Sequence, residues 1–414
     1  MISSLPSQKL WRRPEILRLL LIALLAETGY AVLNISAMPV YLKFDRHYSA
    51  IVIGFVFTGY LLSEASLKGI MGDLADRIGR KKLMTFGPSL TIFTSILTLY
   101  IPSSFGIWAI FLIILLRIID GIGASMLWPA AFALMADTVK EEESQQSMSL
   151  LNICYFLGIA LALPLGGVLD DLAGTIHASF YLSSFIFLLV FLAASRLIPA
   201  DIPVQHHGNV VEPNHLQSLW NCFGKIPEYL ILAFFTFMAI GFPMAIIKIF
   251  SEQQLRMSES AFGLLVLPGA IAMAAFSVPM SKMGERLGSA KAVHTGMGLS
   301  ALGVGIIALG AIFPFARHYI FLALGAIPVG VGFLLAIPAW YSSVSALDPK
   351  KRAANIGAVM TAQGIGAIIG APTGAFFYEK LQVYGHAFGH YSPFLGCLAC
   401  LVISWILSLK ILHA

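Results

Sequence analysis

Six ionisable side chains fall inside long apolar stretches of the sequence, where they could bind a proton, an ion or a polar substrate. At the middle of a bilayer each would cost about 2.5–3.5 kcal/mol if left uncompensated, so residues of this kind are functional candidates. Structural ion pairing is the alternative, because opposite charges three or four residues apart on a helix neutralise each other. Two pairs have that spacing. The six residues are Glu27, Glu64 and Lys68 (i,i+4), Arg117 and Asp120 (i,i+3), and Lys248.

Glu27 has no such partner in its own apolar stretch. It shares a helical stripe with Tyr30, Asn34 and Tyr41, which follow it by 3, 7 and 14 residues. A polar stripe on a membrane helix should face a cavity. A carboxyl group removed from water can be tuned to bind and release protons near neutral pH. We therefore predict that Glu27 is the proton- or cation-binding carboxylate.

Other assignments of the proton site remain open. Asp120 or Glu64 could carry the proton instead, and the third alternative is transport without proton coupling. If Arg117 approached Glu27 across the bundle, the pair could separate when the carboxylate takes up a proton. That separation would be a plausible coupling step.

The second half of the chain contributes fewer charges. Lys248 is its one intramembrane candidate, and we expect it near the outer end of its helix, where it would snorkel to the interface. Trp340 and Tyr341 follow in a later apolar stretch. We expect them to form an apolar, aromatic wall opposite the charged first half.

The elements that position these residues are membrane-spanning helices. Hydrophobic residues make up 58% of the chain and charged residues 11%, and the mean hydropathy is +0.84. Apolar runs long enough to cross about 30 Å of hydrocarbon recur throughout, without the short alternating segments of a membrane β-barrel. The N-terminal run contains Glu27 and is too long for a signal peptide, so it is expected to be the first helix.

Twelve helices are predicted. They cover 15–42, 49–71, 82–101, 105–137, 146–172, 176–198, 226–251, 259–283, 291–314, 317–346, 353–379 and 390–412. The fold class is thus an all-α membrane protein with an N-terminal six-helix bundle (1–198), a cytoplasmic linker (199–225) and a C-terminal six-helix bundle (226–414). Histidines in the linker are expected to be solvated, and Cys397 and Cys400 to pack in the last helix, so no metal site is predicted.

The distribution of basic residues predicts the orientation. Of the 26 Lys and Arg residues, 18 fall on the side that holds both termini and three lie within helices. The other side has five: Lys43, Arg46, Arg256, Arg317 and Lys380. By the positive-inside rule both termini are cytoplasmic. The same distribution offers no basic stripe interleaved with aromatics, so nucleic-acid binding is not expected.

An internal repeat relates the two halves. Adding 209 to first-half numbers places Ser49 and Gly54 on Ser258 and Gly263. The same offset superposes Arg77, Gly79 and Lys82 on Arg286, Gly288 and Lys291, and an offset of 208 superposes Gly158, Pro164 and Gly166 on Gly366, Pro372 and Gly374. An even number of helices precedes each repeat, so both halves insert the same way round, with a substrate site expected between them.

Residues 72–82 are interpreted as a short loop between the second and third helices. They read GDLADRIGRKK, with carboxylates beside a basic cluster and glycines for tight turns. The stretch resembles the signature loop of the major facilitator superfamily, G-x-L-A-D-R-x-G-R-K-K, at every defined position. Residues 281–291 resemble the weaker second copy. The resemblance covers the whole chain and implies a conformational latch, built from Gly72, Asp76, Arg77, Gly79 and Arg80 together with Asp137 at the end of helix 4.

Two further patterns resemble those of proton-coupled exporters of that superfamily. Residues 117–124 match the helix-4 pattern R-x-x-x-G-x-G-A, with Asp120 where the family often has a neutral amide. Residues 158–167 are similar to the helix-5 antiporter motif, with Ala162 and Leu163 as departures. Small residues at Gly158, Gly166 and Gly366 should allow close helix packing, and Pro164 and Pro372 could kink their helices.

The expected function is therefore secondary active transport, most like the twelve-helix drug/proton antiporters. We expect a monomer in the inner (plasma) membrane that exports a small organic compound, with protons as coupling ion and no cofactor. The alternatives are an uptake symporter or facilitator for an organic acid, a lipid flippase, or a membrane receptor. An enzyme is not expected, because the sequence shows no Walker A motif, nucleophile elbow or metal-ligand cluster.

Overall fold

The computed structural model describes residues 10–139, 143–199, 226–347 and 352–412. In the first half, the first helix is a composite. Its α-helical segments α1 (Pro14–Ala31) and α2 (Met38–Val40) alternate with π-helical turns at Val32–Ala37 and Tyr41–Asp45. The helices that follow are α3 (Ala50–Ile78), α4 (Arg80–Leu99), α5 (Ile107–Thr138), α6 (Ser144–Ala173) and α7 (Ala178–Leu197).

The second half repeats this order. Its first helix is divided into α9 (Pro227–Met244) and α10 (Ile247–Gln253), so the continuous helix predicted over 226–251 is wrong. The division follows Pro243, which has no amide hydrogen to continue the helical ladder. The remaining helices are α11 (Glu259–Leu287), α12 (Ser289–Ala308), α13 (Tyr319–Leu347), α14 (Arg352–Lys380) and α15 (His386–Ile411).

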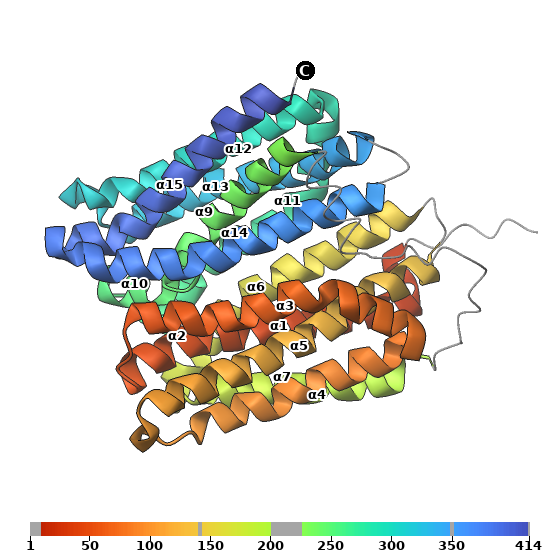
Figure 1. Ribbon diagram of the computed structural model, residues 1–414, viewed down its shortest axis with the longest axis horizontal. Helices are drawn as coiled ribbons and strands as arrows, with labels where there is room; N and C mark the ends of the chain where they lie inside the picture. Colours follow the sequence, from red (N-terminus) through yellow and green to blue (C-terminus); the bar gives the residue numbers. More distant parts are fainter. Residues whose placement is uncertain (1–9, 140–142, 200–225, 348–351, 413–414) are drawn as a thin grey trace, which may run out of the picture.

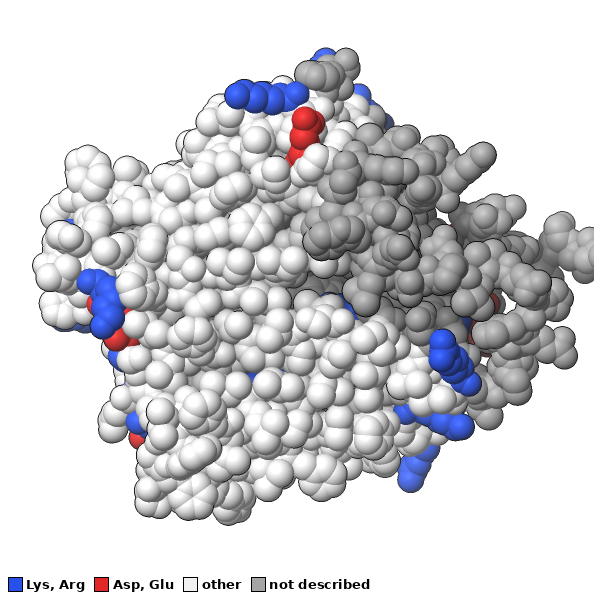
Figure 2. Space-filling model, viewed as in Figure 1, with Lys and Arg blue, Asp and Glu red and all other residues white. Residues whose placement is uncertain are grey.

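The helices are built for a bilayer. Within the described residues, nine helical segments are long and apolar enough to cross a membrane. The internal repeat identifies three further spans, α4, α11 and α14, because the matching helix of the other half is among the nine. Large apolar side chains such as Phe93, Trp108 and Phe111 are exposed on the outside. Figure 2 shows a broad uncharged face, with charged side chains gathered toward the ends of the helices. This chain is a multi-pass membrane protein.

The two halves form two bundles that lie side by side (Figure 1). The first half, from red to yellow-green, occupies the lower part of the view, and the second half, from green to blue, the upper part. Contacts between the halves run mainly through two helix pairs, α6 with α11 and α3 with α14. The predicted all-α fold with two six-helix halves is confirmed.

The two ends of the bundle differ in how the halves meet. We call the end that holds Leu10 and Leu412 the termini end, and the end where the first helix stops at Asp45 the distal end. At the distal end one apolar cluster joins both halves, for example through Leu42 and Phe250. At the termini end the described apolar residues form two separate clusters, one in each half. The structure is therefore closed at the distal end.

The predicted loop over 72–82 is largely helical. The helix α3 continues to Ile78, and α4 begins at Arg80. Only Gly79 forms the turn, with a φ of 110°, and its counterpart Gly288 turns α11 into α12 with a φ of 81°. A side chain at either position would be strained, which explains why both copies of the stretch have glycine there.

Candidate functional site

Glu27 is enclosed by the first-half bundle. Its side chain is buried, with 6% of the residue exposed. Trp128 from α5 is near enough to influence its carboxyl group. A methyl group at Gly158 of α6 would lie only 2.7 Å from the Cβ of Glu27, so α6 approaches α1 at this point as closely as glycine allows. Gly158 therefore packs against the turn of α1 that carries Glu27, in agreement with its predicted role in helix packing.

The charged neighbours of Glu27 come from α3. Glu64 and Lys68 are near enough to act on its carboxyl group electrostatically. They form the predicted ion pair, with 2.8 Å between Lys68 Nζ and Glu64 Oε1. The Lys68 side chain is 41% exposed, in contrast to its partner. The pair therefore remains open to solvent on one side while it balances charge beside Glu27.

Lys68 also faces the second half of the chain. Its charge acts on Tyr341 of α13, across the interface between the bundles. The Tyr341 hydroxyl donates a hydrogen bond of 2.9 Å to Gln363 Oε1 on α14. Glu27, Glu64, Lys68, Tyr341 and Gln363 together form a polar group contributed by both halves, which we call the central cluster.

The rest of the Glu27 stripe is directed into the first half. The Asn34 amide donates to the Tyr30 carbonyl at 3.0 Å and is thereby satisfied within its own helix. The Tyr30 ring packs against Phe187 of α7, with 4.5 Å between ring centroids. Its buried hydroxyl lies beside Gly123 of α5. These two residues thus belong to the wall behind Glu27.

Arg117 and Asp120 form a separate buried pair. Arg117 Nη1 lies 2.6 Å from Asp120 Oδ2, and neither side chain is exposed. Thr94 of α4 donates to the Asp120 carboxylate, and Arg117 Nη2 donates to Thr98 Oγ1 at 3.1 Å. The hypothesis that Arg117 approaches Glu27 is wrong, because this guanidinium is held between α4 and α5.

Lys248 and Trp340 also have well-defined surroundings. Lys248 lies on α10 and forms an ion pair with Glu259 at the start of α11. Its side chain is only 1% exposed, so the expected snorkelling to the interface is wrong. Trp340 packs in the apolar cluster of the second half with Leu335. Its neighbour Tyr341 is the aromatic residue that approaches the first half.

The signature stretch forms contacts within the first half. Arg80 at the start of α4 is paired with Asp137 near the end of α5, and it also donates to the Ala133 carbonyl at 2.7 Å. Gly72 lies against Pro129, and Arg77 is exposed. The side chain of Asp76 is outside the described residues. Among the described side chains of the signature stretch, Arg80 makes the ionic contact with Asp137. The sequence alone does not indicate that Arg80 is the partner of Asp137.

The motif glycines and prolines meet across the halves. A methyl group at Gly54 of α3 would lie 2.9 Å from Pro372 Cα of α14. In the matching contact, a methyl group at Gly263 of α11 would lie 2.7 Å from the Leu163 carbonyl carbon, next to Pro164 of α6. Gly166 and Gly366 pack instead within their own halves, beside Ser36 and Met238 respectively.

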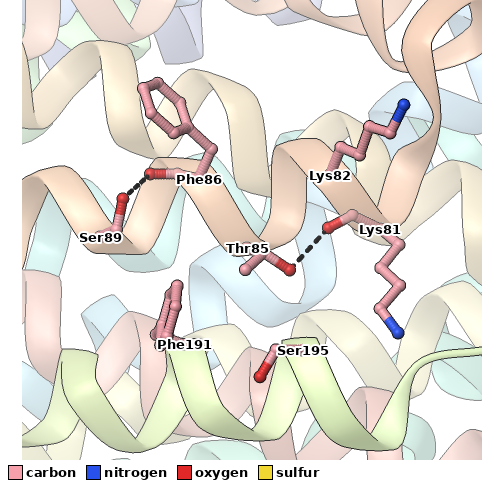
Figure 3. A pocket seen from close by; sticks show the side chains of 7 residues that line it. All are labelled: Lys81, Lys82, Thr85, Phe86, Ser89, Phe191 and Ser195. Atoms are coloured by element: carbon pink, nitrogen blue, oxygen red, sulfur yellow. Dashed lines mark hydrogen bonds between the residues drawn. The ribbon is translucent and has the colours of Figure 1, made fainter.

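Two surface grooves flank α4 near the termini end. The first, of about 340 Å³, lies between α4 and α7. Figure 3 shows Lys81, Lys82 and Phe86 along one side of it and Phe191 and Ser195 along the other. The second groove shares Lys82 and Phe86. Neither contains a residue of the central cluster, and both are openings on the outer surface of the first bundle.

Metal binding finds no support in the part of the chain that the structure describes. No group of three His, Cys, Asp or Glu residues there is arranged to hold an ion. Cys397 and Cys400 are buried in α15, as the sequence predicted. The linker histidines His206, His207 and His215 are outside the described residues.

The chain belongs to the Major Facilitator Superfamily. It matches that family over residues 19–242 and again over 229–412, in agreement with the repeat. The structure superposes on a mutant of the nucleoside transporter NupG with a TM-score of 0.78, at 13% identity and over 96% of this chain and 100% of the other. At that identity the likeness establishes the fold alone.

Three curated relatives have names that refer to drug resistance, efflux or flipping. The multi-drug resistance efflux pump PmrA of Streptococcus pneumoniae is 25% identical over 92% of each chain. The proton-coupled antiporter flippase LtaA of Staphylococcus epidermidis is 22% identical over 79% of each. The chloramphenicol resistance protein CraA of Acinetobacter baumannii is 25% identical over 61% of this chain, and the match spans 60% of CraA.

Proposed function

We propose that this membrane transporter exports a small organic compound in exchange for protons, by alternating access. The observation that carries the proposal is the position of Glu27. This buried carboxylate lies beside the Glu64–Lys68 pair, which in turn faces Tyr341 of the other half. A group placed there can respond both to protonation and to a substrate bound between the halves.

The charge balance of the central cluster supports exchange. With both carboxylates ionised and the lysine protonated, Glu27, Glu64 and Lys68 carry a net charge of −1, and a proton on Glu27 brings it to zero. The ionised cluster attracts a cation, and the neutral cluster does not. A proton and a cationic substrate would therefore compete for the same site, which is the requirement for antiport.

The driving force is sufficient for such a cycle. A membrane potential of about 100 mV is worth about 2.3 kcal/mol per charge, and one pH unit adds about 1.4 kcal/mol. One proton per cycle would then sustain a substrate gradient of several hundred-fold. Its relatives PmrA and CraA, whose names refer to resistance and efflux, support the direction of transport.

Two other functions have a specific observation in their favour. The likeness to LtaA, named a flippase, favours lipid movement as the second candidate. The partly exposed Lys68 would suit an organic acid, which favours uptake as the third. We further propose that the chain acts as a monomer without enzymatic activity in the inner membrane, with both termini cytoplasmic, as the Lys/Arg distribution predicts.

The decisive experiment measures transport in proteoliposomes driven by an imposed pH gradient. Tetraphenylphosphonium serves as the lipophilic cation and a fluorescent phospholipid as the flippase probe. Glu27→Gln should abolish pH-driven movement of the cation and weaken its counterflow without a gradient, because the cluster in this variant is neutral at every pH. Glu228→Gln is the matched control, because Glu228 is exposed in the first turn of α9, at the termini end. Full pH-driven transport by Glu27→Gln would refute the assignment, and movement of the lipid alone would establish the flippase.

A further inference from the structure

Two helices at the distal end have their N-termini capped by the opposite half of the chain. The backbone N–H of Ile51, in the first turn of α3, donates to Oε2 of Glu379 near the end of α14, at 3.3 Å. The backbone N–H of Ser260, in the first turn of α11, donates to Oδ2 of Asp171 near the end of α6, also at 3.3 Å. Each half thus provides one helix terminus and one carboxylate.

These two contacts are copies of each other under the internal repeat. Ile51 and Ser260 differ by the offset of 209, and Asp171 and Glu379 differ by 208. The cap within the helix is duplicated as well. Ser49 Oγ accepts from the Val52 N–H at 3.3 Å, and Ser258 Oγ accepts from the Ala261 N–H at 3.3 Å. Each terminus therefore has a serine of its own helix and a carboxylate of the other half.

The same interface holds close backbone approaches between the halves. Gly54 lies one turn after Ile51 and packs on Pro372, and Gly263 lies one turn after Ser260 and packs on the peptide before Pro164. The carboxylates can reach the helix termini only while these glycine contacts are closed. Because a carboxylate at an exposed helix N-terminus stabilises weakly, such a contact can hold a closed state and still be released.

We propose that Asp171 and Glu379 are the residues that set the balance between the distal-closed and distal-open states of the transporter. They act by capping α11 and α3 across the interface, and both contacts must break when the distal end opens. They are positioning residues, since neither belongs to the central cluster. The inference rests on alternating access as proposed above.

The two contacts should differ in strength. Asp171 is exposed, and Glu252 with its like charge lies near it. Glu379 is less exposed, with 28% of its side chain accessible. Lys248 and Glu259 form their ion pair in the second half. The first half has no such pair, because Pro39 and Ala50 occupy the positions that match these two residues under the repeat. Removal of the Glu379 charge should therefore shift the balance more than removal of the Asp171 charge.

Distance measurements between spin labels test this inference in the full chain. In a background without the four cysteines, one label pair at Thr175 and Val383 reports on the distal end. These residues follow α6 and α14 in the two halves and are exposed. A second pair, at the exposed residues Ile78 and Leu287, reports on the termini end.

The variants are Glu379→Gln, Asp171→Asn and the double variant, with Glu228→Gln as the control of equal charge. Each single change should raise the distal-open population about two- to fivefold, and the double change about four- to twenty-fivefold if the contacts are independent. The distal distance should lengthen as the termini-end distance shortens. This reciprocal change separates a shift in balance from simple loss of structure. Shifts no larger than those of Glu228→Gln would overturn the proposal.

A wild-type measurement keeps the test decisive if a variant does not fold. Salt screens exposed carboxylate–helix contacts, so raising the ionic strength from about 0.02 M to about 0.5 M should shift both distances in the same reciprocal manner. Unchanged distances over that range would also overturn the proposal. No substrate is needed, so failure here is distinguishable from failure of proton-coupled export, which the transport assay decides.

Discussion

Asp120→Asn should destabilise the protein strongly, because it leaves a buried guanidinium without its counter-ion. Arg117 and Asp120 are both fully buried, and Arg117 Nη1 lies 2.6 Å from the carboxylate. In the variant the remaining side-chain contact of the guanidinium is Thr98, at 3.1 Å. Breaking a buried pair from one side costs about 3–5 kcal/mol. Most of that cost is the uncompensated charge.

The double variant Arg117→Met, Asp120→Asn should recover much of this loss, because it removes the charge itself. Both threonines that touch the pair are already bonded within α4, since Thr98 donates to the Thr94 carbonyl at 2.7 Å and Thr94 to the Thr91 carbonyl at 3.4 Å. They would not be left unsatisfied. The exposed pair Lys380–Glu379 provides the comparison, since the Lys380 side chain is 58% exposed and Lys380→Met should cost at most about 1 kcal/mol.

The assay is unfolding of the purified protein in one detergent, followed by tryptophan fluorescence, for the wild type and the three variants. The expected order of stability is wild type and Lys380→Met highest, the double variant next and Asp120→Asn lowest. An Asp120→Asn protein within about 1 kcal/mol of wild type would refute the structural role. If that stable variant also lost pH-driven transport, Asp120 would replace Glu27 as the proton carrier.

Three further outcomes follow from the contacts. Gly158→Ala should destabilise the protein by about 1–3 kcal/mol through overpacking and should reduce transport. Gly269 has open space around it, so Gly269→Ala should leave stability and transport unchanged in the same unfolding and transport assays. Lys248→Met should cost about 3–5 kcal/mol in unfolding measurements, because it leaves the mostly buried Glu259 unpaired. Arg80→Gln should cost at most about 1 kcal/mol, since its carboxylate partner is 55% exposed; a larger loss of stability would contradict that reading.

The fold could be predicted from the sequence because a bilayer imposes a pattern of long apolar runs. Each span must satisfy its backbone internally and present apolar side chains to lipid, so long apolar runs mark the helices. The ends of the helices are harder to predict from the sequence. The sequence predicts a loop over the polar stretch 72–78, yet this stretch continues α3 as far as Ile78. Polar residues are compatible with a helix wherever a span leaves the hydrocarbon region.

Only those contacts of the site that lie within one helix could be predicted from the sequence. The pairs Glu64–Lys68 and Arg117–Asp120 follow from helical spacing, and both form. Contacts between different helices carry no such spacing. The approach of Trp128 and Gly158 to Glu27, and the burial of Lys248 beside Glu259, depend on which helix faces meet.

The sequence by itself determined twelve spans, two repeats offset by 209 residues, and a first half that holds most of the intramembrane charge. Tertiary structure decided that the repeats meet crosswise, so that Gly54 packs on Pro372 and Gly263 beside Pro164. It also decided that Glu27 has Glu64 and Lys68 as charged neighbours, rather than Arg117. The physical reason is that hydropathy and helical period act along one helix, whereas the partner of each face is selected by the joint packing of all the helices.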